Sequence, residues 1–487
     1  MPRLSTATLD LATPALERLR YDREKAGIGV VHFGPGAFHR AHQAFYMDEA
    51  LALGGDWAIC AAALRSTDVR DALTPQDNLY ILAELERTTR YRTIGAIKQT
   101  LAGAGDRPAL LNRLADPATR IVTMTVTEKG YCLKGDGTLD FDHPDIVRDV
   151  AAPQNPVSLI GHLVEGLRRR FAAGTLPFTP IACDNLVDNG VKLGRAVAAL
   201  AARQDAALAR WIEQEVAFPC TMVDSITPAT DDALRQRVAA ETGLEDAWPI
   251  QRERFTQWVI EDKFCNERPD FAAIGVTLTQ DVGAFDRAKL RILNGPHSTL
   301  AYLGSLIGHE TVADAMGDAV LAGFLRRLIM EDILPTVKGA AGFDLNRYAE
   351  DILARFGNPG IRHLLSQIAW DGSAKLPFRL FGTVTDRLAA GAPVDRLALP
   401  VAAWMHFIRR KAQDGTKLTD PLADALLTAA GHLSSDATRD VALFLAFEQV
   451  FPPALRDNDV FRAALIRAYQ LLGQGSKEQV HHALQTI

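Results

Sequence analysis

A short segment in the second half of the chain carries three side chains that can serve one reaction: Lys289, Asn294 and His297. A lysine whose pKa burial lowers toward neutrality acts as a general base, and amide groups stabilise negative charge developing on oxygen. At about 100° per residue, an α-helix places all three within an arc of roughly 140°, which is one helix face. A solvated lysine, a capping asparagine and a core histidine would show the same residue types, so both interpretations stay open.

The first half begins with a pattern that can bind a pyrophosphate. Residues 28–33 predict a buried strand, Gly34-Pro-Gly36 follows, and a helical pattern extends over 37–53. Glycines let the backbone approach phosphates, and a helix N-terminus offers free N–H groups. His39 occupies the place of the third glycine of the usual fingerprint. The pattern therefore fits a nucleotide loop and also an ordinary turn.

Further strands are predicted at 57–64, 121–127 and 178–183, each followed by polar residues. Ligands of open α/β sheets bind at this carboxyl edge. Asp68, after the second strand, can bind ribose hydroxyls and repel a 2′-phosphate, which favours NAD, whereas Arg65 leaves NADP open. Glu128, Lys129 and Asn185 follow the later strands, where surface charges and turn residues are equally common.

From about residue 286 onward, helical periodicity dominates. Helices are predicted at 289–308, 312–331, 361–370, 398–411, 418–432, 439–450 and 457–473. A chain of 487 residues is too long for one core, so we expect an α/β domain over 1–284 and an all-α domain over 285–487. Small-molecule sites concentrate in clefts between domains, and the segment with Lys289 starts the second one.

Composition argues against several other classes of protein. The net charge of −6 does not suit a nucleic-acid surface. No apolar run approaches the roughly 18 residues of a membrane span, and the N-terminus lacks a signal core. The five cysteines fit neither a disulfide framework nor a Cys-x-x-Cys metal site. These features favour a cytoplasmic protein without a metal ion.

Several motifs together resemble one family. They are the run Lys-x-x-x-x-Asn-Gly-x-His ending at His297, the run Gly34-Pro-Gly-Ala-Phe-His-Arg-Ala-His-Gln43, and the run Trp370-Asp-Gly-Ser-Ala-Lys-Leu-Pro377. They are similar to motifs of the polyol-specific long-chain dehydrogenases, which include mannitol 2-dehydrogenases and fructuronate reductases. The resemblance covers nearly the whole chain. It implies a Rossmann-like nucleotide-binding domain followed by an all-helical C-terminal domain.

The resemblance also implies roles for individual residues. Lys289 is the expected base for hydride exchange between a nicotinamide and a secondary alcohol, with Asn185, Asn294 and His297 binding the substrate. Expected cofactor residues are Gly34, Gly36, Phe38, His39, Arg40, Arg65 and Asp68, and expected substrate residues are Glu128, Lys129, Arg291 and Lys375. Asp224 is expected near the lysine, and Asp286 replaces a glutamate that is usual in the family.

Two departures from the mannitol enzymes bear on the substrate. Those enzymes commonly have glycine where this chain has Lys129, and arginine where it has Gln367. A cation suits a carboxylate, so D-fructuronate and D-mannonate are the leading pair, with mannitol, arabinitol or sorbitol as alternatives. Members of the family are often monomers, and we expect the same of this chain. The expected small-molecule partners are a sugar alcohol, ketose or hexuronate, and the expected cofactor is NAD, with NADP not excluded.

Two other interpretations remain. A zinc alcohol dehydrogenase would need three convergent ligands, drawn from His39, His42, Cys60 and Cys132. A protein that binds a nucleotide without turnover would keep the fold alone. Every expected catalytic position is filled, which favours an enzyme.

Overall fold

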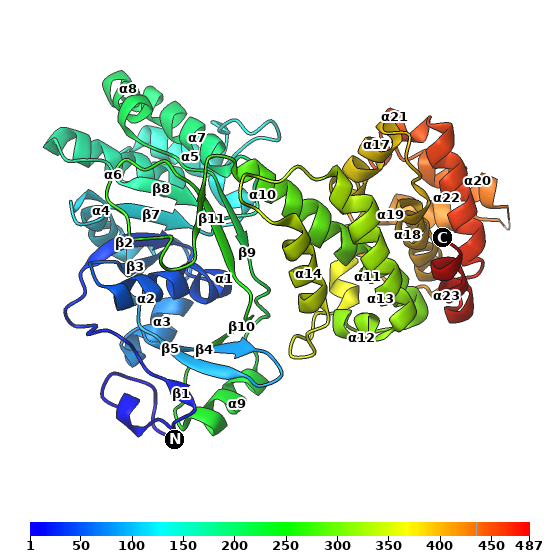
Figure 1. Cartoon of the computed structure of the whole chain (residues 1–487). Helices are drawn as coiled ribbons and strands as arrows, with labels where there is room; N and C mark the ends of the chain where they lie inside the picture. The colour runs from blue at the N-terminus through cyan, green and yellow to red at the C-terminus, as the bar shows by residue number, and fades with distance from the viewer. Residues whose placement is uncertain (435) are drawn as a thin grey trace. The chain divides into compact units, whose positions relative to one another are not determined.

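The computed structural model describes residues 1–434 and 436–487. The chain divides into two compact units, Met1–Gly283 and Ala284–Ile487, and Figure 1 labels most of their helices and strands. Each unit has its own buried side chains. The two units are therefore described one at a time.

The first unit is built on a five-stranded parallel sheet. Across the sheet the order is β6 (Ile97–Ala102), β3 (Ala58–Ala63), β2 (Ile28–Phe33), β7 (Ile121–Met124) and β8 (Thr179–Ala182). The chain moves outward from β2 to β6 and then returns to β7, so the winding reverses between β2 and β7. This is the doubly wound order of nucleotide-binding domains, and it confirms the expected Rossmann-like fold.

Helices, short 3₁₀ turns and two small sheets complete the first unit. The helices are α1 (Ala37–Ala41), α2 (Gln43–Leu53), α3 (Asp68–Leu73), α4 (Arg107–Ala115), α5 (Pro144–Ala151), α6 (Leu159–Ala173), α7 (Asn189–Gln204), α8 (Ala206–Glu215) and α9 (Asp232–Thr242), and the 3₁₀ turns are η1 (Leu9–Leu11), η2 (Thr74–Gln76), η3 (Ala104–Asp106) and η4 (Glu128–Tyr131). One small sheet has the order β1 (Leu16–Glu17), β5 (Arg90–Ile94), β4 (Tyr80–Leu85), β10 (Ile250–Glu253), and the other has the order β12 (Thr277–Thr279), β11 (Gln257–Glu261), β9 (Thr221–Asp224).

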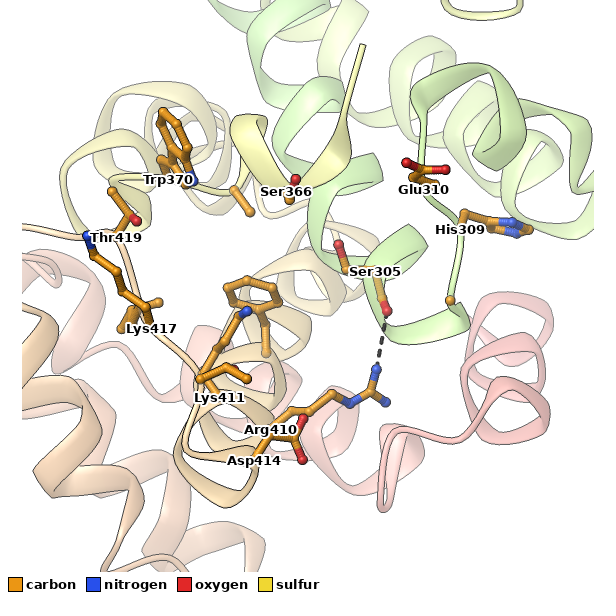
Figure 2. A pocket seen from close by; sticks show the side chains of 15 residues that line it. Ser305, His309, Glu310, Ser366, Trp370, Arg410, Lys411, Asp414, Lys417 and Thr419 are labelled. Atoms are coloured by element: carbon orange, nitrogen blue, oxygen red, sulfur yellow. Dashed lines mark hydrogen bonds between the residues drawn. The ribbon is translucent and has the colours of Figure 1, made fainter. Parts of the chain in front are cut away.

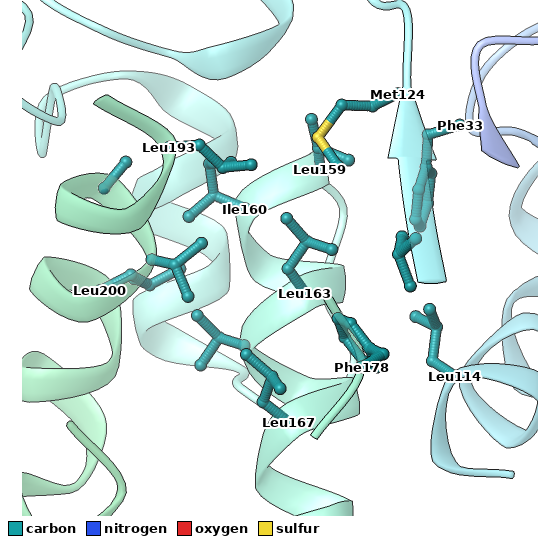
Figure 3. Close-up of a cluster of buried hydrophobic side chains, with 14 of the residues drawn as sticks. Phe33, Leu114, Met124, Leu159, Ile160, Leu163, Leu167, Phe178, Leu193 and Leu200 are labelled. Atoms are coloured by element: carbon teal, nitrogen blue, oxygen red, sulfur yellow. The ribbon is translucent and has the colours of Figure 1, made fainter. Parts of the chain in front are cut away.

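Both faces of the parallel sheet are buried. Phe33 and Met124 point into a core that they share with α4, α6 and α7, where Figure 3 shows them beside Leu159 and Leu163. Their neighbours along the strands, such as Val30, point into the opposite core with α2. Because side chains alternate across a strand, strands buried on both faces appear as continuous apolar runs. This is why the sequence pattern located them.

Two differences from the sequence pattern lie at the carboxyl edge of the sheet. The strand predicted to reach residue 127 ends at Met124, because the N–H groups of Val126 and Thr127 donate to the Asp184 carboxylate. The helix predicted over 37–53 divides at His42, where φ is −119° and ψ is −86°. The His42 Nε2 atom lies 2.9 Å from the carbonyl oxygen of Gln257, which is more than two hundred residues away in the chain. Tertiary contacts thus override the local helical pattern.

In the second unit the described residues form helices and no strands, which confirms the expected helical C-terminal domain. The elements are α10 (Val282–Ala288), which begins at the unit boundary, η5 (Lys289–Asn294), α11 (Gly295–Ile307), α12 (Val312–Gly317), α13 (Ala319–Arg327), η6 (Leu328–Ile333), η7 (Leu334–Thr336), α14 (Leu345–Phe356), α15 (Leu365–Ile368), α16 (Gly372–Leu376), η8 (Pro377–Phe381), α17 (Gly382–Ala389), α18 (Asp395–Asp414), α19 (Ala423–Ala430), α20 (Ala437–Leu445), α21 (Pro453–Arg456), α22 (Asp459–Leu472) and α23 (Lys477–Thr486). Among the helices described here, none is long and apolar enough to cross a membrane.

The centre of the second unit is α11. It packs against α12, α13, α15, α18 and α23, and nearly all of its side chains are buried. The helix predicted over 312–331 divides at Asp318, whose carboxylate accepts the N–H groups of Val320 and Leu321 and so caps α13. The helix predicted over 361–370 is reduced to Leu365–Ile368.

Three stretches of this unit, η5, η6 and η8, are π-helical. In η5 the N–H of Gly295 donates to the Leu290 carbonyl, five residues earlier. Pro296 follows and has no N–H for the carbonyl of residue 292, so the α-helical pattern cannot continue unbroken. The α-helix predicted to start at residue 289 is therefore wrong in its first turn, which adopts the wider spacing that often marks functional positions.

Candidate active site

A cavity of about 430 Å³ lies at the carboxyl edge of the parallel sheet. Its walls come from the segments that follow β2, β3 and β7, and they include Gly34, Arg65, Ser66, Thr127 and Lys129. This is the place where the winding of the sheet reverses, and doubly wound proteins bind their ligands at such a point. The cavity is therefore the candidate cofactor site of the first unit.

The loop after β2 has the backbone that a phosphate cradle needs. Gly34 has φ +83°, and a Cβ atom there would lie 2.2 Å from the Thr125 carbonyl oxygen, so only glycine fits. At Gly36, the N-cap of α1, a Cβ atom would have the Gly34 carbonyl oxygen as its nearest neighbour, at 3.9 Å. The tight turn and the open space beside it fit a pyrophosphate group.

The Phe38-His39-Arg40 run supports this loop from inside the protein. The His39 ring is fully buried and stacks on His32 with 3.3 Å between ring centroids. The buried Arg40 side chain donates through Nη1 to the Trp248 carbonyl at 2.7 Å. The His39 and Arg40 side chains were expected to contact a cofactor; both are fully buried, and neither lines the cavity.

Arg65 and Asp68 differ in their positions. Arg65 lines the main cavity and a smaller adjoining one of about 190 Å³, and its Nη2 atom donates to Asp145 Oδ2 at 2.8 Å. Asp68 is exposed at the start of α3 and lines neither cavity. The smaller cavity also has Arg107 and Arg148 on its wall. The structure therefore brings Arg65, rather than Asp68, to the cavity.

The turn with Glu128 and Lys129 is fixed by a partly buried carboxylate. Asp184 accepts hydrogen bonds from Val126 N at 3.0 Å, Thr127 N at 2.9 Å and the Tyr131 hydroxyl at 2.7 Å. Burial raises the pKa of Asp184 above its usual range. Both charged side chains of the turn are exposed, and Lys129 lines the cavity.

Asn185 follows Asp184 directly and is exposed after the carboxyl end of β8. The turn that contains it is anchored by Asn189, whose Nδ2 donates to the Thr221 carbonyl at 3.0 Å and whose Oδ1 accepts from Thr221 N at 2.9 Å. Asp224 is buried at the end of β9. These polar residues thus occupy ordered strand ends within the first unit.

In the second unit, η5 and α11 carry the catalytic candidates. Lys289 and Asn294 are the first and last residues of the π-helical segment, and both are partly buried. Residues five apart would lie about 140° apart around an α-helix. The i to i+5 pattern of a π-helix instead places them one turn apart. The π-helix therefore places the proposed base, Lys289, and the proposed amide donor, Asn294, nearer to the same face of the helix than an α-helix would.

His297 lies one turn into α11 and is 7% exposed. Its ring packs against Phe356 at 4.5 Å and His363 at 5.2 Å between centroids, and its Nε2 atom is buried without a hydrogen-bond partner among the described residues. Burial, aided by His363 and Arg379, holds the pKa of His297 well below its usual range. The ring is therefore neutral, with one nitrogen available to a ligand.

Arg379 is a residue that the motifs did not reveal. Its Nη1 atom donates to Ser298 Oγ at 3.1 Å and approaches the Asn294 carbonyl at 3.5 Å, so it ties η8 to the start of α11. Burial lowers the pKa of Arg379. A lone arginine four residues after Lys375 has no distinguishing sequence signal, because its contacts are more than eighty residues away in the chain.

The remaining candidates of the helical unit make different contacts and do not form one cluster in the contacts described: they are Lys375, Gln367 and Arg291. The half-buried Lys375 donates through Nζ to the Ile368 carbonyl at 3.4 Å, and burial together with Arg379 lowers the pKa of Lys375. Gln367 is exposed on α15. Arg291 donates through Nη1 to Asp386 at 2.6 Å and to Thr336 Oγ1 at 2.9 Å, so its guanidinium is used within the helical unit.

The described residues contain no group of three or more His, Cys, Asp or Glu side chains arranged to hold a metal ion. The free cysteines Cys60 and Cys132 are buried. Burial raises the pKa of Cys60 to about 12 and that of Cys132 to about 11. Neither thiol is therefore in the thiolate form near neutral pH.

Comparison with known proteins agrees with this architecture. Residues 28–273 match the mannitol dehydrogenase Rossmann domain, and residues 281–472 match the mannitol dehydrogenase C-terminal domain. The chain is 40% identical over 491 residues to D-mannonate oxidoreductase of Escherichia coli, and 39% identical over 473 residues to mannitol 2-dehydrogenase of Cereibacter sphaeroides. The alignments cover 99% of both chains in the first case, and 96% of this chain and 98% of the relative in the second.

Two solved structures show the same fold over the full length. Mannitol 2-dehydrogenase of Pseudomonas fluorescens, in a ternary complex with NAD and D-mannitol, is 37% identical with a TM-score of 0.81 and 99% coverage of both chains. A D-sorbitol dehydrogenase in substrate-free form is 32% identical with a TM-score of 0.91, covering 99% of this chain and 100% of that one. The protein therefore belongs to the mannitol dehydrogenase family of oxidoreductases.

Proposed function

We propose that this protein is an NAD-dependent dehydrogenase that interconverts D-fructuronate and D-mannonate. The observation that carries the proposal is Lys129, an exposed cation on the wall of the cavity beside the nucleotide loop. A hexuronate differs from a hexitol by its carboxylate, which a lysine can bind through a charge-assisted hydrogen bond. The similarity to D-mannonate oxidoreductase over 99% of both chains supports this choice.

In the proposed mechanism Lys289 takes the hydroxyl proton when the alcohol is oxidised and returns it when the ketone is reduced. Asn294 donates to the substrate oxygen, and an amide donor of this kind contributes on the order of 3 kcal/mol to transition-state stabilisation. Asn185 is proposed as a further donor. The neutral His297 ring orients the substrate through Nε2. A bound nicotinamide supplies the hydride acceptor or donor.

The proposed cofactor is NAD. The complex of the Pseudomonas fluorescens relative with NAD supports this choice, as does the fit of the Gly34 turn to a pyrophosphate. Arg65 on the cavity wall is the feature that favours NADP instead. Initial rates with both cofactors, for the wild type and for Asp68→Ala, test the assignment. A preference for NAD that falls in the variant supports it, and unchanged cofactor kinetics removes Asp68 from the site.

The substrate assignment is tested at Lys129. In Lys129→Met the specificity constant for fructuronate should fall about tenfold to a hundredfold, since a charged hydrogen bond contributes roughly 1.5–3 kcal/mol. The constant for fructose should stay the same. Lys134→Met is the matched control, because Lys134 is an exposed lysine that approaches Asp140 and Asp142. Equal losses for both substrates would overturn the role of Lys129.

A second candidate function is oxidation of mannitol, or of a related pentitol or hexitol. The favouring observation is the match to the mannitol and sorbitol enzymes at TM-scores of 0.81 and 0.91. In that case Gln367 fills the role that an arginine has in the mannitol enzymes of the family. We also propose that the enzyme acts as a monomer, which size-exclusion chromatography with light scattering tests.

A further inference from the structure

A second cavity, of about 330 Å³, lies in the helical unit at the carboxyl end of α11 (Figure 2). Its walls are formed by the end of α11, the segment that leads into α16, the end of α18 and the loop after α18. Lys289, Asn294, His297 and Lys375 are absent from its walls. It is therefore separate from the catalytic candidates of this unit.

One wall of the cavity is aromatic. Trp370 lines it and is 47% exposed, which is high for so large an apolar residue. Phe407 lines it from α18, with the Lys411 ammonium 5.5 Å from the ring centroid. Exposed aromatic faces of this kind pack against flat rings and against the C–H groups of sugars.

The lining of the cavity also carries positive charge that no carboxylate of the described part of the chain neutralises. Among the described residues, Lys411 and Lys417 have no carboxylate oxygen within 4.0 Å of Nζ. The Arg410 guanidinium is already used within the protein, because it donates hydrogen bonds to the carbonyls of Ser305, Leu306 and Gly475. The carboxylate of Glu310 is paired with Arg362. The two lysines are thus the cations that a ligand can use.

We propose that this cavity binds a small organic phosphate that carries a ring, either a sugar phosphate or a nucleoside monophosphate. Lysine ammonium groups bind phosphate as point charges, and Trp370 packs against the ring. The hydroxyls of Ser305 and Thr419 on the wall can bind ring substituents. The cavity volume falls in the range of small-molecule sites, about 300–1,000 Å³.

The walls of this cavity are joined to the segment that carries Lys375. The N–H of Asp371 donates to the Thr419 carbonyl at 2.9 Å, and the N–H of Ser373 donates to Asp420 Oδ2 at 2.9 Å. A ligand held between Trp370 and Lys417 would therefore stiffen the connection to α16. If the proposed function holds, such a ligand changes the KM of the sugar substrate through Lys375. This last step alone depends on the proposed function.

Calorimetric titration of the full-length protein tests the site. AMP and glucose 6-phosphate are titrated separately with NADH at saturation, so that the nucleotide loop of the first unit is filled. We expect at least one of them to bind, and binding to weaken at least tenfold in the Lys411→Gln/Lys417→Gln double variant. Lys477→Gln, an exposed lysine on α23, is the matched control and should bind as the wild type does.

Each outcome decides a part of the proposal. No binding of either compound, or equal binding by the double variant, overturns the site. Inorganic phosphate binding as tightly as both compounds, with no effect of Trp370→Ala, overturns the role of the ring. The titration is independent of turnover, so its result stands apart from the proposed function. Circular dichroism of each variant confirms that the fold is retained.

Discussion

Thr127 has a backbone φ of +64° and donates its N–H to Oδ1 of Asp184 at 2.9 Å. This conformation is strained for a β-branched residue, by roughly 1–3 kcal/mol, and persists only where its surroundings enforce it. The partly buried Asp184 carboxylate does so by also accepting hydrogen bonds from Val126 N and the Tyr131 hydroxyl. Glu128 and Lys129 follow in this turn, where both are exposed and Lys129 lines the cavity, and Asp184 is therefore a positioning residue for the cavity wall.

Replacing Asp184 by asparagine should disturb this turn. An amide has one acceptor oxygen, so it cannot serve Thr127 N together with Val126 N and the Tyr131 hydroxyl. We expect KM for the carbonyl substrate to rise about tenfold with a smaller change in kcat, and the free energy of unfolding to fall by about 1–3 kcal/mol. Steady-state kinetics and urea unfolding measure both.

Two variants control the Asp184 prediction. Tyr131→Phe removes one bond of the three and should give a smaller rise in KM. Asp188→Asn alters an exposed residue in the next turn with φ +54°, a conformation that asparagine also accepts, and should change neither quantity. Wild-type KM and stability in Asp184→Asn would show that the carboxylate does not hold the turn.

Replacing Lys289 by alanine should abolish turnover while NADH binding remains. The proton of the alcohol then has no base within the π-helical segment, whereas the loop at Gly34 is untouched. NADH fluorescence measures binding and absorbance at saturating substrate measures turnover. A small added amine should restore part of the rate. Substantial turnover near neutral pH without the amine would remove Lys289 from the role of base.

Replacing Arg379 by methionine should lower kcat more than it raises KM. The guanidinium binds Ser298 and approaches the Asn294 carbonyl, so its loss lets the start of α11 shift. A lost charged hydrogen bond of about 1.5–3 kcal/mol predicts a fall in kcat of at least tenfold. Arg379→Lys should recover part of it. Arg439→Met, on the exposed side of α20, is the control. Equal kinetics for the two methionine variants would contradict the positioning role.

Buried histidines should make the fold sensitive to mild acid. Burial lowers the pKa of His162 to about 4 and that of His406 to about 4. In the unfolded chain these rings titrate near 6.5, so below that pH the unfolded state binds more protons and stability falls as pH falls. Each ring should lower the free energy of unfolding by about 1.5 kcal/mol between pH 6.5 and 5.

The comparison of wild type with His406→Gln isolates this effect. Glutamine keeps a donor for the Tyr469 carbonyl, which lies 3.2 Å from His406 Nε2, but cannot take up a proton near pH 5. Urea unfolding at pH 7 and pH 5 should therefore show a smaller loss of stability in the variant. The same loss in both proteins would mean that His406 does not titrate on unfolding.

The sequence predicted the central sheet well because its strands are buried on both faces. Runs such as 28–33 are apolar throughout, and the expected strand and the observed β2 coincide. The sequence predicted the ends of strands and helices less well where contacts with distant residues set the backbone conformation. The strand after residue 121 is cut short by Asp184, about sixty residues away, and the helix over 37–53 is broken at His42.

The candidate site shows the same division. The motif around Lys289 pointed to this segment, but periodicity could not reveal its π-helical spacing, which depends on Pro296 and on packing within the helical unit. Asp184 and Arg379 act through contacts far apart in sequence, so no local pattern marks them. His39 and Arg40 belong to a recognisable motif, yet the motif does not tell a buried support from a ligand contact.

The most direct test of the central proposal is the rate of NADH oxidation by the purified wild-type protein with D-fructuronate and with D-fructose, measured side by side. The proposal predicts rapid turnover of fructuronate and little or none of fructose, because the cavity wall presents Lys129 to a carboxylate. Efficient turnover of fructose without turnover of fructuronate would contradict it, and would identify a polyol dehydrogenase in which Gln367 replaces the expected arginine.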